Sequence, residues 1–498
     1  MSRSLFARLN HRYGRRVDGA TRRGFLQATL AASAGLLLGG CETTSTAPSR
    51  KVRDGARHIV VIGAGFAGLA CGHELKSAGY RVTVLDPRSR VGGRVFSSDR
   101  FVKGKNVELG AELVGSNHPV WVAYAKQFGL EFLDVTEDEN LEAPIILDGK
   151  ALASEQAEKL WEEMDAAFNT LNAQAEAVNV EQPWLTSGAA EIDKTPLSDW
   201  WKKLEASDVG RKAIWAQLAS DNAVELDRQS TLAMLTAIKA GGGEKYWTES
   251  EVYRCKGGNQ QLAVKLAEAI GDDNVLLKLA ATKVTQSDKG VAVTCSDGRV
   301  IEADEVVLTV PPTVWHKIAF APALPADAQT QMGLAVKYLS ALKKRYWKDA
   351  GLAPDSLSDG PVSQTWEGTD NQEGDENVGL VAFSGGAAVK VLRESRTDDQ
   401  LNDLYARALE ARYPGYGQNL VTKTFMDWPG DPWTLAGYSF PAPGDVTRCG
   451  PTLHGGAGRI HFAGEHTSYK FAGYMEGGLN SGAAVAKRIA LRDGVVKG

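Results

Sequence analysis

Three glycines near the start of the chain have the spacing of a phosphate-binding turn. Gly63, Gly65 and Gly68 follow an apolar, β-branched run, and a helical pattern comes after them. In a turn of this kind the first glycine permits a tight bend, the second lets the backbone approach a pyrophosphate, and the third lets helix and strand pack closely. These glycines, with Phe66 and Ala67 between them, therefore predict a site for an adenine dinucleotide.

The elements expected around these glycines form a complete β-α-β unit. We expect a strand over 59–62, a helix over 66–78 and a second strand over 81–85, which Asp86 follows directly. The Asp86 carboxylate can then accept hydrogen bonds from ribose hydroxyls of the dinucleotide. The glycine spacing alone is common in turns, so the prediction depends on this context of strand, helix and strand.

Two further motifs resemble those of the flavin-containing amine oxidase family. The first is Gly92-Gly93-Arg94, whose glycines and arginine suit a second diphosphate contact, and the family's N-terminal motif ends in this Gly-Gly-Arg. The second lies near the C-terminus, in Phe462-Ala463-Gly464-Glu465-His466 and Gly473-Tyr474-Met475-Glu476-Gly477-Gly478. The resemblance runs from about His58 to the C-terminus, and it implies FAD as the bound dinucleotide.

The order of the predicted elements places the chain in the α/β class. We expect a discontinuous Rossmann-like FAD-binding domain made of residues 57–115, 250–318 and 451–498. Its middle piece carries one helical pattern and a set of short strand patterns, at 262–270, 275–279, 282–287, 290–295, 300–302 and 306–310. Residues 116–249 and 319–450 are expected to form an inserted α+β substrate-binding domain, helix-rich in the first segment and strand-rich in the second. The resemblance implies the amine oxidase, or glutathione reductase-2-like, fold.

The resemblance assigns catalytic roles to a lysine and two tyrosines. Lys337 lies in a strand-like apolar segment, and it matches the family lysine that holds a water against flavin N5. Tyr438 and Tyr474 match the positions whose rings flank the substrate amine, which two rings can orient by stacking and dipolar contact. Without the resemblance the usual interpretation is structural. A lysine among apolar residues is often a surface side chain with a buried stem, and most single tyrosines are packing residues.

The resemblance also implies cofactor contacts outside the first glycine turn. Gly93 and Arg94 are assigned to the diphosphate, and the backbone of Val284 is assigned to the adenine. Gly464 and Glu465 are assigned to the flavin ring, and the backbone of Met475 to its pyrimidine end. Mammalian monoamine oxidases link their flavin to a cysteine where this chain has Gly437. We therefore expect FAD to be bound without a covalent bond.

Three residues near the first motif bear on the substrate. Many L-amino-acid oxidases of similar sequence place, at the position of Phe96, an arginine that clamps the substrate carboxylate, and phenylalanine cannot make that contact. Glu112 is a candidate partner for the distal ammonium of a diamine, with a structural hydrogen bond at a domain crossover as the alternative. Glu112 and His118 are both candidates to face the flavin.

The sequence therefore predicts an FAD-dependent amine oxidase. The amine is expected to lose hydride from its α-carbon to flavin N5, and the imine then hydrolyses to an aldehyde or ketone plus ammonia or a smaller amine. Oxygen is the expected electron acceptor and gives hydrogen peroxide, with a periplasmic cytochrome or quinone as the alternative. Two other functions stay open: an L-amino-acid oxidase, and a flavoprotein that modifies or binds a partner protein at a membrane surface.

Residues 1–40 are expected to be an export signal outside the folded domains. Seven arginines precede the apolar stretch 25–38, which is shorter than a membrane span. Thr21-Arg22-Arg23-Gly24-Phe25-Leu26 resembles a twin-arginine signal, and Leu38-Gly39-Gly40-Cys41 resembles a lipoprotein cleavage box. We expect the twin-arginine machinery as a partner, a periplasmic location and a lipid anchor on Cys41, with residues 41–56 as a flexible tether. Cleavage to a soluble product is the alternative.

Charge and cysteine content narrow the kinds of substrate, partner and metal site that the sequence allows. The formal net charge is −5, and removing residues 1–40, which hold seven arginines and one aspartate, leaves −11. An acidic surface favours cationic substrates, and no nucleic-acid motif is present, so no nucleic-acid partner is expected. Besides Cys41, the cysteines are Cys71, Cys255, Cys295 and Cys449, without C-x-x-C or metal-ligand spacing. No metal is expected, and a disulfide among them after export stays open.

Overall fold

The first glycine turn lies at the end of a strand in a five-stranded parallel sheet. The computed structural model describes residues 4–14, 55–136, 141–394 and 397–496. Strands β1 (His58–Ile62) and β2 (Arg81–Asp86) are parallel neighbours joined by α3 (Phe66–Ser77), as the β-α-β pattern predicts. The sheet order is β20-β13-β1-β2-β9, with β9 at Val275–Leu277, β13 at Glu305–Leu308 and β20 at Ile460–Phe462.

This sheet is covered on both faces, which explains the continuous apolar run of β1. Alternate residues of a strand point to opposite faces. Ile59 and Val61 pack with α3, α11 (Gln260–Ile270) and α16 (Met475–Arg492). Val60 and Ile62 pack on the other side with a second sheet, of order β12-β11-β10-β14, whose strands are β10 (Ala281–Ser287), β11 (Gly290–Cys295), β12 (Val300–Ala303) and β14 (Ala319–Ala321).

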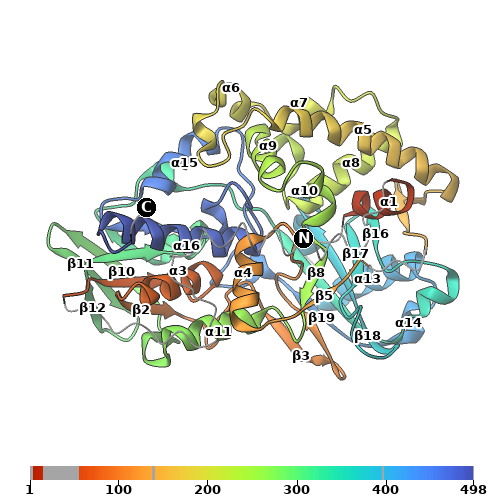
Figure 1. Cartoon of the computed structure of the whole chain (residues 1–498). Helices are drawn as coiled ribbons and strands as arrows, with labels where there is room; N and C mark the ends of the chain where they lie inside the picture. Colours follow the sequence, from red (N-terminus) through yellow and green to blue (C-terminus); the bar gives the residue numbers. More distant parts are fainter. Residues whose placement is uncertain (1–3, 15–54, 137–140, 395–396, 497–498) are drawn as a thin grey trace.

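The inserted segments form a seven-stranded sheet and a layer of helices (Figure 1). The sheet order is β19-β15-β18-β17-β16-β6-β7, with bounds Leu420–Met426, Ala335–Lys344, Glu376–Gly385, Gln364–Glu367, Ser356–Ser358, Ile145–Leu147 and Lys150–Ala151. The helices α5 to α10 span Ala157–Ala175, Ala189–Lys194, Leu197–Trp201, Asp208–Asp221, Thr231–Ala240 and Glu244–Glu249. The expected helix-rich first segment and strand-rich second segment are both present.

Helix α4 (Pro119–Phe128) ties the first inserted segment to the cofactor side of the molecule. Glu476 in α16 accepts hydrogen bonds from the backbone N–H groups of Val120 at 3.0 Å and Trp121 at 2.9 Å. A helix leaves its first N–H groups without intrahelical partners, and the Glu476 carboxylate satisfies two of them. Helix α4 therefore packs with α16, although the predicted boundary assigns residues 116–249 to the substrate-binding domain.

Part of the segment expected to lie outside the fold is packed against it. Residues Leu5–Tyr13 form helix α1, which contacts α5 and α10 and buries Leu5, Phe6 and Leu9. The physical reason is its pattern, because apolar residues at positions 5, 6 and 9 share one helical face. The twin-arginine motif, the apolar stretch 25–38 and Cys41 lie outside the described residues.

Three further features concern the described residues, namely membrane-spanning helices, cysteines and metal sites. No helix within the described ranges is long and apolar enough to cross a bilayer. Four cysteines, Cys71, Cys255, Cys295 and Cys449, fall in these ranges, and all four are buried free thiols. None of the described His, Cys, Asp and Glu side chains gather into a group of three or more that could hold a metal ion.

Candidate active site

A cavity of about 1110 Å³ lies where the parallel sheet meets the seven-stranded sheet. Most of the predicted site residues line it, namely Gly63, Gly65, Phe66, Ala67, Asp86, Gly93, Arg94, Lys337, Tyr438, Gly464, Glu465, Tyr474 and Met475. The chain thus brings both ends of its sequence and the middle to one place.

The glycine turn has the shape that a diphosphate requires. Gly63 has a φ of +116°, which favours glycine, and a Cβ at Gly68 would lie 1.9 Å from the Gly63 carbonyl oxygen. Gly65 is the N-cap residue of α3, and it forms a bridge with Gly92 of the second motif. The start of a helix carries N–H groups and a partial positive charge, which suit an anion. The residues present are therefore compatible with the diphosphate of FAD.

Asp86 lies at the end of β2 and lines the cavity beside the glycine turn. Its carboxylate accepts hydrogen bonds from the backbone N–H groups of Ala64 and Arg88, both at 2.8 Å. Burial raises the pKa of Asp86, and the two backbone hydrogen bonds oppose that rise. Each carboxylate oxygen has a further lone pair, so Asp86 keeps capacity to accept from a ribose hydroxyl.

Arg94 and Glu465 form an ion pair that joins the two predicted motifs. Arg94 Nη1 donates to Glu465 Oε1 at 2.7 Å and to the Gly437 carbonyl at 2.9 Å. The other Glu465 oxygen accepts from Ser439 Oγ at 2.6 Å and from the Gly473 N–H at 2.8 Å. Burial opposes the ionised form of Glu465, but the Arg94 charge and these hydrogen bonds outweigh it and lower the pKa.

Lys337 is a buried ammonium with protein oxygens on several sides. It lies on β15, and its Nζ donates to Glu112 Oε2 at 2.7 Å, to the Gly110 carbonyl at 2.8 Å and to the Glu108 carbonyl at 3.2 Å. Glu112 also lies 3.4 Å from Arg254 Nε, with both of those side chains buried. Burial opposes ionisation of Glu112, but the charges of Lys337 and Arg254 prevail and lower its pKa.

The two predicted tyrosines reach the cavity from separate elements. Tyr438 precedes Ser439 in the loop that carries Gly437, and its hydroxyl donates to the Asp221 carbonyl at 2.9 Å. Tyr474 is the N-cap residue of α16, and the rings of His118 and Phe471 lie edge-on near it, with His118 at a centroid distance of 5.2 Å. Burial raises the pKa of both hydroxyls well above the usual range, so both are neutral donors.

Five residues singled out in the sequence do not line this cavity. Gly68 packs behind the turn, and Val284 is fully buried on β10, where it pairs with Val293 and Phe320. Phe96 lies under the Arg90 guanidinium at 4.0 Å, and Glu112 is bound to Lys337. His118 packs beneath Tyr474, and burial lowers its pKa to about 3, so the ring is neutral.

The structure adds cavity residues that the sequence did not single out. Arg88 lines the cavity and donates to Asp431 Oδ1 at 2.5 Å and to Thr434 Oγ1 at 2.9 Å. Trp428 and Trp433 also line it, and they come from the same loop region as Thr434. The sequence signal that could have indicated these cavity residues is the segment 428–434, where two tryptophans accompany prolines and glycine just before the Gly437-Tyr438 pair.

The geometry agrees with a comparison at the level of families. Residues 66–490 match the family described as flavin-containing amine oxidoreductase. The chain belongs to this family. It is therefore a flavin-dependent enzyme that oxidises amines, as the two glycine motifs predicted.

Individual relatives support the same assignment. A probable flavin-containing monoamine oxidase A of Dictyostelium discoideum is 26% identical over 461 residues, which cover 86% of this chain and 97% of that protein. An L-amino acid dehydrogenase of a Synechocystis species is 25% identical over 458 residues, which cover 86% and 94%. The solved structure of a putrescine oxidase double mutant has a TM-score of 0.80 at 24% identity and covers 88% of this chain and 99% of that one. The structural likeness confirms the predicted fold.

Proposed function

We propose that this enzyme oxidises a small amine, using FAD held without a covalent bond. The observation that carries the proposal is the convergence in one cavity of the glycine turn, Lys337, Tyr438, Tyr474 and the start of α16. When bound, FAD accepts the hydride equivalent from the α-carbon of the amine. The imine then leaves and is hydrolysed to a carbonyl compound and an amine or ammonia.

The side chains of the site supply orientation and charge. Tyr438 and Tyr474 present neutral aromatic walls, which attract an entering ammonium and hold the amine that reacts. Lys337 supplies a positive charge on the wall of the cavity, and its three protein acceptors fix that charge in place. A donation from Lys337 to a water or to the cofactor requires one of these three contacts to be given up, because an ammonium has three donors.

The arginines of the cavity favour an amine over an amino acid as substrate. Arg88 and Arg94 line the cavity, and each is paired with a carboxylate, Asp431 and Glu465 respectively. Each guanidinium charge is thereby compensated by a protein carboxylate, so neither arginine is an unpaired cation for a substrate carboxylate. An L-amino-acid substrate remains the second candidate because one relative is an L-amino acid dehydrogenase.

The cavity lining supports non-covalent binding of the flavin. Among the described residues, no cysteine or histidine lines the cavity. A Cβ at Gly437 would lie 2.6 Å from the Cβ of Ala335, so a cysteine there would collide with β15. Acid denaturation should therefore release all the flavin into the supernatant, and yellow colour retained on the precipitated chain would contradict the proposal.

The electron acceptor and the location of the enzyme belong to this proposal as well. We propose oxygen as acceptor, with a periplasmic cytochrome or quinone as the competing one, and export by the twin-arginine route followed by lipid attachment at Cys41. The motifs at 21–26 and 38–41 support export and attachment. A Cys41→Ala variant should move from the membrane to the soluble fraction, and an unchanged membrane fraction would reject the anchor.

One experiment tests the reaction directly. The purified protein is mixed without oxygen with a panel of monoamines, diamines, polyamines and L-amino acids, and flavin absorbance is followed. We expect rapid bleaching by an amine and none by the amino acids, and peroxide on admission of oxygen. Bleaching by amino acids alone would favour the second candidate. Absence of bleaching by any small molecule would favour a function on a partner protein.

A further inference from the structure

Helix α1 lies between the helical layer and the seven-stranded sheet, and its own apolar contacts hold it there (Figure 1). Ser4 caps its first turn by accepting from the Ala7 N–H at 3.2 Å. Phe6 lies edge-on to Phe168 of α5, with ring centroids 5.0 Å apart, and Leu5 and Leu9 are buried beside it. A short helix is marginal in isolation, so these tertiary contacts are what keep α1 in place.

Two polar contacts fix the register of α1. Arg8 Nη1 donates to Asp355 Oδ2 at 2.7 Å, and both side chains are only 6% exposed. The Phe6 N–H donates to Gln217 Oε1 in α8 at 3.0 Å. A buried charge is tolerated only when it is paired, so Arg8 and Asp355 specify one seated position of the helix.

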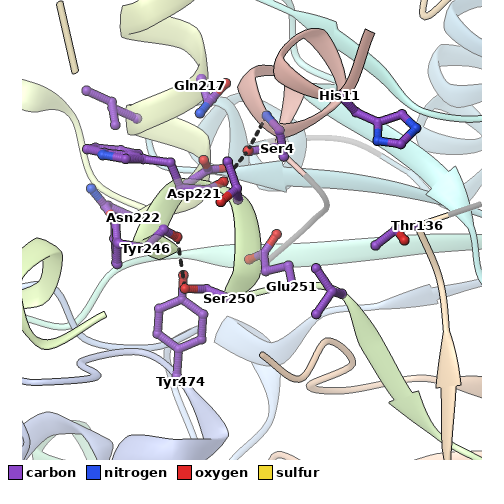
Figure 2. Close-up of a pocket in the computed structure, with 15 residues that line it drawn as sticks. Ser4, His11, Thr136, Gln217, Asp221, Asn222, Tyr246, Ser250, Glu251 and Tyr474 are labelled. Carbon is purple, nitrogen blue, oxygen red and sulfur yellow. Dashed lines mark hydrogen bonds between the residues drawn. The ribbon is translucent and has the colours of Figure 1, made fainter. Parts of the chain in front are cut away.

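The seated helix forms one wall of a second cavity. Ser4, Ala7 and His11 line it from α1, and Tyr246 and Tyr474 line it from the protein core. In Figure 2, Tyr474 lies on the opposite side of this cavity from Ser4 and His11. Tyr474 also lines the cofactor cavity, so the two cavities share this side chain.

We propose that, in the chain that still carries residues 1–40, α1 is an intramolecular wall that closes the far end of the substrate cavity and so limits the length of the amine that is accepted. The proposal rests on the proposed function, because it takes Tyr474 as the boundary beside which the amine reacts. A long amine extends past Tyr474 and meets Ser4, Ala7 and His11, whereas a short amine does not reach them. Removal of residues 1–40, the predicted processing, would take this wall away.

The test compares full-length variants of the buried ion pair. Asp355→Arg places two positive charges together and should expel α1, and the double variant Arg8→Asp/Asp355→Arg should seat it again. Arg12→Asp is the matched control, because it reverses a charge on the exposed side of the same helix. If Asp355→Arg fails to bind flavin, Leu9→Asp replaces it, since that change lies on α1 alone.

Two measurements are made on each variant. Chymotrypsin cleavage within residues 5–13, followed by mass spectrometry, reports whether α1 is seated without reference to activity, because its sites at Phe6 and Tyr13 are unchanged in every variant. Rates of flavin bleaching by a series of straight-chain primary amines report the length limit. If α1 is seated for about nine-tenths of the time, its release should raise kcat/KM for long amines about tenfold and leave short amines within about twofold.

The outcomes separate this proposal from the proposed function. Faster cleavage and a tenfold gain for long amines in Asp355→Arg, both reversed in the double variant, support it. Faster cleavage with an unchanged length limit, or equal cleavage in the wild type and Asp355→Arg, overturns it. If no amine bleaches the flavin in any variant, the proposed function fails, and the proposal fails with it even where the cleavage pattern shows that α1 is seated.

Discussion

Lys337 combines a structural and an electrostatic role in one side chain. Its ammonium compensates the buried Glu112 carboxylate, whose other cationic partner among the described residues is Arg254, with Nε at 3.4 Å. It also supplies a cation on the part of the cavity wall that β15 forms. The two roles can be separated because the first depends on the charge of Glu112 and the second does not.

Replacing Lys337 by methionine should lower both stability and activity. Loss of one partner of a buried ion pair costs about 3–5 kcal/mol, and loss of a preorganised charge lowers kcat by about 10²–10³. In the double variant Lys337→Met/Glu112→Gln the unpaired charge is gone, so thermal stability should recover in part while kcat stays low. Recovery of kcat in the double variant would show that Lys337 acts only through the fold.

Residue identity alone could not reveal which polar groups are already paired. The sequence left Glu112 open between a substrate contact and a structural bond, and the structure shows the structural bond, to Lys337. These partners lie 225 positions apart, so no local pattern could join them. The predicted Lys337, Tyr438 and Tyr474 do line one cavity, because the resemblance supplied the long-range information that residue spacing lacks.

At the scale of elements, the start of α3 is the most constrained turn of the cofactor site. Gly68→Ala would place its Cβ 1.9 Å from the Gly63 carbonyl and should force the turn open. The matched control is Gly72→Ala in the same helix, whose Cβ would meet the Ile270 Cδ1 atom at 3.0 Å and the Val84 Cγ2 atom at 3.2 Å, both of them side-chain methyl groups rather than backbone. Both changes raise helix propensity by about 1 kcal/mol, so they differ only in packing.

We expect Gly68→Ala to lose most of its bound FAD and about 1–3 kcal/mol of stability, while Gly72→Ala keeps both. The ratio of flavin to protein absorbance after gel filtration measures the bound FAD, and thermal unfolding measures the stability. Equal flavin content in the two variants would mean that the turn tolerates a side chain.

The junction of α4 and α16 should respond to pH through Glu476. Burial raises the pKa of Glu476 to about 7 from an ordinary 4.5, and the N–H groups of Val120 and Trp121 oppose that rise. A folded-state pKa above the unfolded value means that Glu476 contributes stability below about pH 4.5, which is lost as the pH rises through 7. Since Glu476→Gln does not titrate, the stability of the wild type relative to this variant should fall over that range.

The size of this fall follows from the shift, on the order of 3 kcal/mol. Thermal unfolding of both proteins between about pH 5 and pH 8 measures most of it, because comparison within one pH cancels the other titrating groups. A difference in Tm that does not change with pH would show that Glu476 titrates normally in the folded protein.

Elements with a strong local pattern were predictable, and those that depend on distant partners were not. The predicted strand at 290–295 coincides with β11, and the predicted helix at 66–78 agrees with α3 within one residue. Helix α1 was taken as outside the fold because seven arginines dominate residues 1–23, yet Arg8 is neutralised by Asp355 far along the chain. The resemblance assigned the backbone of Val284 to the adenine, and this stays a prediction, because the structure shows only that its side chain packs between two sheets.

At the scale of the whole molecule, the cofactor cavity joins two sheets that otherwise have separate cores. Val336 and Val60, for example, belong to different hydrophobic clusters. A ligand that contacts both sides stabilises only the arrangement in which both are folded. Saturating FAD, at about 100 times its Kd, should add about 2.7 kcal/mol to the stability of the apoprotein.

We therefore expect one unfolding transition in the presence of FAD, at a higher Tm than without it. Calorimetry of the apoprotein at increasing FAD concentration measures both quantities. Two transitions, of which only one moves with FAD, would mean that the cofactor binds one domain without coupling the other. Titration with adenosine diphosphate, which lacks the flavin ring, is the control for binding at the glycine turn alone.

The start of α16 has a consequence for how the enzyme matures. This helix begins at Met475 and supplies the last wall of a cavity whose first wall is Gly63. A growing chain on the ribosome thus carries an unfinished binding site until Met475 and the start of α16 have been made. Flavin insertion must therefore follow the synthesis of α16, and nascent chains halted anywhere before Met475 should emerge colourless.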